Sequence, residues 1–102
     1  MASTVRCRVA DLPRQWRDGV GRLANPTGVV ILPIHLDWSP PGREWDLSVA
    51  AHRRRVSELV LENGTERDVV EWLDPAQLRA DFDDMVLPRS VLEVWQPWFD
   101  AA

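Results

Sequence analysis

The sequence contains no lysine, no tyrosine and only one cysteine. The shortage of cysteine bears directly on the class of protein. The single cysteine, Cys7, excludes an internal disulfide bond and fits a reducing compartment. No apolar run approaches the ~18 residues that a membrane-spanning helix needs. The N-terminus lacks the hydrophobic region of a signal peptide. We therefore expect a cytoplasmic protein with no membrane segment.

Aromatic residues are instead supplied by tryptophan, because the chain has six Trp and two Phe among 102 residues. Each Trp buries ~150–250 Å² of surface, so a few of them can anchor a small core or a contact surface for a partner. Charged residues make up 27% of the chain and hydrophobic residues 45%, as in an ordinary folded protein. The length predicts a single domain.

The charges are distributed unevenly along the chain. Residues 1–55 carry nine arginines and five acidic residues, a net charge of +4, whereas residues 56–102 carry three arginines and eleven acidic residues, a net charge of −8. A field of one sign steers partners of the opposite sign, so the acidic half favours a basic protein partner. The simpler alternative is a solvated acidic face that only maintains solubility.

The stretch from Asp46 to Gly64 predicts the central helix of the fold. Its apolar positions recur with helical periodicity and define one buried face: Val49, His52, Val56, Leu59 and Val60. Asp46 or Ser48 is expected to cap the start of this helix. Asn63 and Gly64 are expected to end it in a left-handed conformation.

The N-terminal part is predicted to be irregular. Residues 4–9 alternate apolar and arginine side chains, which indicates a short strand. Residues 11–28 read as a loop, with one helical turn after Pro13. We expect residues 1–28 to form a mobile N-terminal extension and residues 29–102 to form a single small helical domain.

A second strand is predicted at Val29–Leu36, a continuous apolar run rich in β-branched residues. Pro33 lacks a backbone N–H and therefore restricts this strand to the edge of a sheet. The turn at residues 39–42 follows, and Trp38 and Trp45 on either side of it are expected to pack together.

Three further helices are predicted. Thr65–Asp68 resembles a capping box and opens a short helix. Asp74–Pro75 combines a cap with proline at the first helical position, and this helix should end near Leu87. Pro88 opens a last helix that Pro97 interrupts.

The fold class that follows is mainly α (α+β). Four short helices are expected to pack together, preceded by one or two short strands and the irregular N-terminal segment, because none of the helices is stable alone.

Residues that could carry chemistry are few. His35 and Asp37 share one face of a predicted strand, but a metal site generally needs three or four protein ligands. The other histidine, His52, lies on the predicted buried face. Cys7 could pair with a histidine, yet nothing orients the base or supplies an oxyanion hole. We therefore predict no catalytic, cofactor-binding or metal-binding residues and no enzymatic activity.

Arg53, Arg54 and Arg55 precede a helix–turn–helix-like pattern, which makes a DNA-binding transcriptional regulator the alternative hypothesis. The candidate recognition helix, TERDVVEWLD, carries four acidic residues and one arginine. Because attraction to phosphates supplies most non-specific DNA affinity, this helix would be repelled from the groove. Nucleic acid is therefore the less favoured partner.

Three motifs carry a resemblance to a known group: DLS at residues 46–48, R-x-x-E-L-V-L-x-x-G from Arg55 to Gly64, and D-x-x-V-L-P from Asp83 to Pro88. They resemble small uncharacterised bacterial proteins that are commonly encoded beside nucleotidyltransferase-like toxins of the abortive-infection type. The resemblance covers about residues 32–98, and its motifs mark helix faces and ends. It implies an antitoxin or accessory role in a toxin-antitoxin system.

The functional hypothesis is therefore a non-enzymatic, antitoxin-like protein-binding module whose basic partner is encoded by a neighbouring gene. Pro97 should turn the following residues off the helix axis, so that Trp98 projects as an apolar patch while Trp95 packs in the core. The predicted partner-binding residues are Trp98, Phe99, Asp81 and Asp84.

Overall fold

Helices dominate the computed structural model, which describes residues 8–18, 28–37 and 43–101. The helical elements are η1 (Val9–Asp11), α1 (Arg14–Arg17), α2 (Ala50–Asn63), α3 (Glu66–Trp72), α4 (Pro75–Asp81), η2 (Phe82–Asp84) and α5 (Arg89–Asp100). A two-stranded antiparallel sheet pairs β1 (Val29–Val30) with β2 (Trp45–Asp46). The prediction of a mainly helical α+β fold is confirmed.

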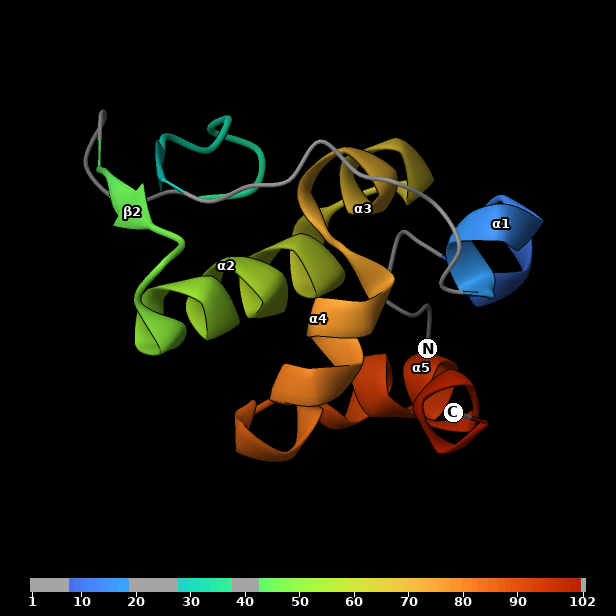
Figure 1. Ribbon diagram of the computed structural model, residues 1–102. Helices are drawn as coiled ribbons and strands as arrows, with labels where there is room; N and C mark the ends of the chain where they lie inside the picture. Colours follow the sequence, from blue (N-terminus) through green and yellow to red (C-terminus); the bar gives the residue numbers. More distant parts are fainter. Residues whose placement is uncertain (1–7, 19–27, 38–42, 102) are drawn as a thin grey trace.

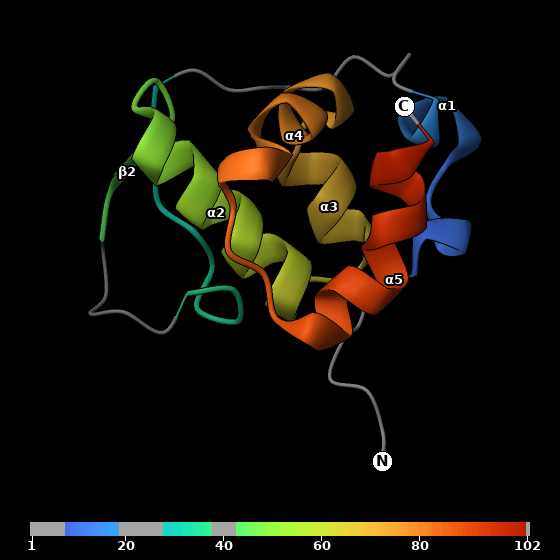
Figure 2. The ribbon, with the colours of Figure 1, turned by 90° about the horizontal axis from the view of Figure 1, so that it is seen from below.

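The elements are arranged on either side of α2, as Figures 1 and 2 show. In both views β2 lies at one end of the molecule, while α1 and α5 lie together at the opposite end. The core runs between these ends, and α2 contributes Val56, Leu59, Val60 and Leu61 to it. Within the parts of the chain that are described, no helix combines the length and apolar composition needed to cross a membrane.

The start of α2 differs from the prediction. The Asp46 carboxylate accepts hydrogen bonds from the backbone N–H and the hydroxyl of Ser48, at 3.0 and 2.6 Å, so these two residues form a turn and neither caps the helix. Val49 occupies the N-cap position with extended backbone and is exposed, not buried as predicted. His52 is half-buried, and its Nδ1 accepts the backbone N–H of Asp46 at 2.9 Å.

Gly64 ends α2 for a reason other than the predicted left-handed turn. Its φ is −90°, a value open to any residue. A Cβ atom at this position would lie 2.7 Å from the carbonyl oxygen of Val60 and 2.9 Å from the Cβ of Asp68. Close packing between the end of α2 and the start of α3 therefore requires glycine here.

The caps of α3 and α4 are confirmed. Asp68 Oδ2 accepts the backbone N–H of Thr65 at 2.9 Å, which completes the capping box. Asp74 accepts the N–H of Gln77 at 3.2 Å, and Pro75 is the first residue of α4. The prediction that this helix runs to Leu87 is wrong, since α4 ends at Asp81 and is followed by the single turn η2.

The last helix begins after Pro88 as predicted, but Pro97 does not interrupt it. Trp95, Trp98 and Phe99 lie three and four positions apart, on one face of α5, and all three are buried. Burial of three aromatic side chains outweighs the ~3 kcal/mol that proline costs inside a helix. The chain therefore stays helical through Pro97.

The segment 8–18 belongs to the domain core, which corrects the prediction of a separate extension. Leu12 and Trp16 are buried, and the Trp16 indole stacks on Trp98 at a centroid distance of 5.3 Å. Trp16 Nε1 also donates to the carbonyl oxygen of Leu73 at 3.0 Å. The helical turn predicted after Pro13 is confirmed as α1. Most of the strand predicted at residues 4–9 lies outside the described residues.

The strand predicted at Val29–Leu36 is shortened to the two residues of β1. Pro33 has no N–H to donate, and its carbonyl oxygen instead accepts the N–H of Leu36 at 2.9 Å in a turn. Leu32 and Leu36 anchor this segment in the core. The predicted packing of Trp38 on Trp45 lies outside the described residues because Trp38 is not among them.

Candidate functional site

Three of the four predicted partner-binding residues are buried. Trp98 and Phe99 are each 7% exposed and Asp81 is 6% exposed, so the prediction that Trp98 projects as a surface patch is wrong. The helix continues through Pro97 and directs both aromatic rings inward, where Phe99 stacks on Phe82 at a centroid distance of 3.9 Å. Only Asp84 lies on the surface as predicted.

Asp81 has a structural role. Its carboxylate accepts Nε of Arg53 at 2.8 Å and Nη2 of the same residue at 3.1 Å, a bidentate ion pair between α4 and α2. Hydrogen bonding to Asp81 raises the pKa of Arg53 above its ordinary value. Arg53 Nη1 also donates to the carbonyl oxygen of Leu47, so this arginine ties the end of β2 to the helices.

Many acidic side chains of the C-terminal half likewise have partners within the protein. Glu58 accepts hydrogen bonds from Arg55 and from the N–H of Val86, at 3.1 and 3.0 Å. Asp68 and Asp74 cap helices. Asp83 and Asp84 are different, because both are exposed and neither forms an ion pair within the described residues. The exposed acidic surface is therefore smaller than the sequence charge suggested.

His35 and Asp37, which share one face of the predicted strand, form hydrogen bonds with different residues. His35 Nε2 lies 3.0 Å from Asp68 Oδ2, whereas the Asp37 carboxylate accepts the indole N–H of Trp45 at 2.9 Å. Across the described residues no group of three or more His, Cys, Asp and Glu side chains converges to hold a metal ion.

Asp68 therefore links the turn at His35 to the start of α3. Burial raises the pKa of the Asp68 carboxyl, but the hydrogen bonds from the Thr65 N–H and from His35 outweigh burial, so the pKa is lowered overall.

A strip of aliphatic side chains is exposed along residues 29–34. Val29 is 58% exposed, Ile31 55% and Ile34 75%, while Val30 and Leu32 turn inward between them. We call Val29, Ile31 and Ile34 the aliphatic strip. Three large aliphatic side chains within six residues form more apolar surface than the scattered exposed residues common on proteins.

The backbone of β1 has hydrogen-bonding groups on the side that faces away from β2. Leu47 N–H donates to the carbonyl oxygen of Gly28 at 2.9 Å, and Val29 lies opposite Asp46 in the register. Because N–H and C=O groups of successive strand residues point to alternate sides, those of Val29 point away from β2. Among the described elements, no strand pairs with that side of β1.

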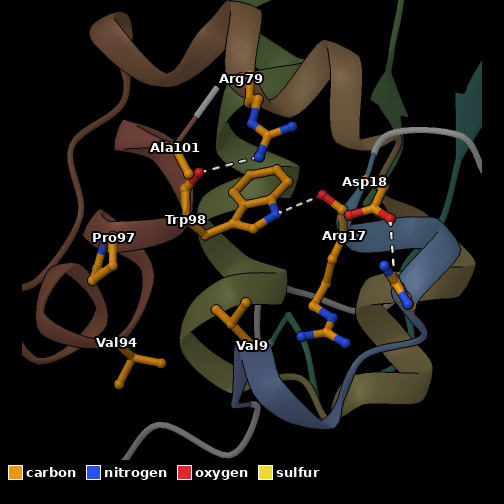
Figure 3. Close-up of a pocket in the computed structure, with 9 residues that line it drawn as sticks. Val9, Arg17, Asp18, Arg79, Val94, Pro97, Trp98 and Ala101 are labelled. Carbon is orange, nitrogen blue, oxygen red and sulfur yellow. Dashed lines mark hydrogen bonds and ion pairs between the residues drawn. The ribbon is translucent and has the colours of Figure 1, made fainter.

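A second surface feature is an open pocket of about 670 Å³ at the other end of the molecule, shown in Figure 3. It lies between α1, α4 and α5. Its lining combines charged and apolar side chains: Val9, Arg14, Arg17, Asp18, Arg79, Val94, Pro97, Trp98 and Ala101. We call it the arginine pocket.

Trp98 forms part of the wall of this pocket, and its indole is held in place by Arg17 and Arg79. Its Nε1 donates to the carbonyl oxygen of Arg17 at 2.9 Å, and the guanidinium carbon of Arg79 lies 3.8 Å from its ring centroid. Arg79 Nη2 also donates to the carbonyl oxygen of Trp98 at 3.1 Å (Figure 3). Sequence reasoning missed this pocket because its residues come from opposite ends of the chain.

Comparisons with protein-family models, curated proteins and solved structures find no match to this chain.

Proposed function

We propose that the chain is a non-enzymatic protein-binding module whose contact surface is the aliphatic strip. The observation that carries the proposal is the exposure of Val29, Ile31 and Ile34, each more than half exposed. Covering such surface is worth ~25 cal/mol per Å² of apolar area removed from water, which favours association. The strip replaces Trp98 and Phe99 as the proposed site of partner contact, since both of these are buried.

The occupant that fits this surface is an extended segment of the partner. The N–H and C=O groups of Val29 face away from β2, so an added strand could continue the sheet on that side. The partner's alternate apolar side chains would then cover Val29 and Ile31. A short edge strand whose outer side pairs with no described strand, and which has aliphatic neighbours, is the usual starting point for pairing of this kind.

The resemblance makes the proposal more specific: the partner is a nucleotidyltransferase-like toxin encoded by a neighbouring gene, and this chain acts as its antitoxin or accessory protein. The exposed carboxylates of Asp83 and Asp84 support a basic partner, because they form no ion pair within the described residues. Such charges accelerate encounter more than they add affinity.

DNA binding remains the less favoured alternative. Two of the three consecutive arginines are engaged inside the protein, Arg53 with Asp81 and Arg55 with Glu58. The short helix α3 carries Glu66, Asp68 and Glu71. Neither feature favours contact with phosphates. We expect affinity for duplex DNA no tighter than about 10⁻⁶ M at physiological salt.

The experiment is co-expression of this chain with the neighbouring gene product, followed by size-exclusion chromatography and a growth assay. We expect a stable complex and rescue from toxicity. The double variant Ile31→Ser and Ile34→Ser should weaken the complex by about tenfold or more, because polar side chains replace the buried apolar contact.

The matched control is Val86→Ser, which removes an aliphatic side chain that is 81% exposed in the connection before α5. It should leave complex formation unchanged. A complex that tolerates the double variant in the strip but not Val86→Ser would place the contact elsewhere. Absence of any complex, together with no rescue of growth, would refute the antitoxin role.

A further inference from the structure

The arginine pocket concentrates positive charge in a protein whose formal net charge is −4. Three guanidinium groups, those of Arg14, Arg17 and Arg79, line it together with one carboxylate, Asp18. The pairing of that carboxylate with Arg14 is a surface contact of 3.7 Å between exposed side chains, which contributes little energy. The pocket therefore keeps an excess of positive charge.

The guanidinium donors of the pocket are incompletely used. Arg17 donates no side-chain hydrogen bond to any described residue, and its Nε is buried without an acceptor. Arg79 Nε is also buried without an acceptor, although its Nη2 is bonded to the carbonyl of Trp98. In Figure 3 the Arg17 guanidinium carries no dashed line, whereas that of Arg79 does. Buried polar groups are normally satisfied, so unpaired guanidinium donors beside a pocket point to an acceptor that binds there.

The opposite side of the pocket is apolar. Val9 comes from η1, while Val94, Pro97 and Trp98 come from α5. A volume of about 670 Å³ lies within the range of small-molecule sites, and is larger than a single inorganic anion needs. Guanidinium groups match the geometry of carboxylates and phosphates.

We propose that the arginine pocket binds a small organic molecule that carries a carboxylate or phosphate group. The oxyanion is held by Arg14 and Arg17, and the apolar body rests against Val9, Val94 and Pro97. Arg79 acts as a positioning residue, because its guanidinium group stacks on the face of the Trp98 ring and holds it in place. This site is distinct from the aliphatic strip, which lies with β1 near the other end of the molecule (Figure 1).

The test is titration of the full chain with benzoate, phenyl phosphate and inorganic phosphate, followed in ¹H–¹⁵N NMR spectra. We expect saturable shifts of the Arg17 Nε–H and Trp98 indole N–H signals. At least one organic anion should bind about tenfold more tightly than inorganic phosphate, because its ring is removed from water. Preference for benzoate identifies a carboxylate site, and preference for phenyl phosphate identifies a phosphate site.

Arg17→Gln should reduce the affinity for the preferred anion by about tenfold or more while leaving the melting midpoint near that of the parent. The fold should tolerate this change because Trp98 bonds to the backbone carbonyl of residue 17, which the variant retains. Arg14→Gln is a second variant, since its side chain is 87% exposed and, among the described residues, forms an ion pair with Asp18 alone. The matched control is Arg89→Gln on α5, outside the pocket and 93% exposed.

The proposal is overturned if none of the three anions produces saturable shifts at these signals. It is also overturned if Arg17→Gln and Arg14→Gln bind the organic anions as tightly as Arg89→Gln does, because the affinity would then come from general surface charge.

Discussion

An aromatic cluster around α5 consists of Trp16, Trp95, Trp98 and Phe99. This cluster and the aliphatic strip are both rich in large apolar side chains, yet only the cluster is buried. In the cluster, Trp16 stacks on Trp98 and packs edge-to-face against Trp95, at centroid distances of 5.3 and 6.0 Å. The polar edges of Trp16 and Trp98 each reach a backbone carbonyl, so these indoles are buried with their N–H groups satisfied.

The strip has no comparable support. Val29 and Ile31 lie on β1 and the segment that follows it, and Ile34 lies in the turn that Pro33 begins. In the extended part, alternate side chains such as Val29 and Ile31 point away from the core, and all three side chains of the strip are more than half exposed. Apolar character alone therefore does not distinguish a core from a contact surface. What distinguishes them here is whether the side chains lie on a helix face packed into the domain or on a short extended segment at its edge.

The largest effect should come from the cluster. Trp16→Ala removes a side chain that is 2% exposed and should cost ~3–5 kcal/mol of unfolding free energy, a large share of the stability of a domain this size. Denaturant unfolding of the parent and the variant measures this loss of unfolding free energy. A loss below about 1 kcal/mol would mean that residues 8–18 are an extension outside the core and that the cluster does not depend on α1.

The ion pair between Arg53 and Asp81 joins α2 to α4, and Arg53 also donates to the carbonyl oxygen of Leu47 beside β2. Arg53→Ala leaves the nearly buried Asp81 carboxylate without its main partner and should cost ~1–3 kcal/mol. Hydrogen exchange should speed up at β2 as well as in α4.

The control for this prediction is Arg55→Ala on the same helix, whose pairing with Glu58 is half-exposed. It should cost no more than ~0.5 kcal/mol. Equal losses for the two variants would show that the Arg53 pair is screened like a surface contact.

The parts that could be predicted from the sequence are those fixed by local contacts. The caps at Thr65–Asp68 and Asp74–Pro75 involve residues a few positions apart, so their types and spacing specify them. The contact of Trp98 with Arg17 joins residues 81 positions apart, and no local pattern encodes it. The arginine pocket was missed for the same reason.

Two further differences have specific causes. The spacing of Trp95, Trp98 and Phe99 is that of one helical face, and burial of these side chains outweighs the local rule that proline interrupts a helix. The run Val29–Leu36 is apolar at nearly every position, so it contains no alternation that tells the outward side chains from the inward ones.

A smaller and pH-dependent effect is expected at Asp68, which holds the segment of the strip through His35 and caps α3. Asp68→Ala should cost ~0.5–2 kcal/mol at pH 7. The pKa of Asp68 is lowered in the folded protein. The carboxylate therefore contributes its full stabilisation above the pKa of the unfolded chain, about 4, and this stabilisation is lost as pH falls through the pKa of the folded protein. The difference between parent and variant should therefore shrink below about pH 4.

Denaturant unfolding of parent and variant between pH 7 and pH 3 checks this expectation. Glu71→Ala on the same helix is the control, because its side chain is exposed and has no partner within the described residues. It should change stability by less than about 0.5 kcal/mol at either pH. A difference for Asp68→Ala that stays constant down to pH 3 would show that its carboxylate charge does not stabilise the cap.

The smallest effect should come from the strip itself, where Ile34 and Leu36 provide a matched pair two positions apart. Ile34 is 75% exposed and Leu36 1% exposed, so Ile34→Ala should change the unfolding free energy by less than about 0.5 kcal/mol, whereas Leu36→Ala should cost ~2–5 kcal/mol. Denaturant melts of the two variants measure both values. If Ile34→Ala proves as costly as Leu36→Ala, the strip is covered within the isolated protein and is part of its core. A small effect for Ile34→Ala leaves this side chain available to a partner, which is what the proposed contact surface requires.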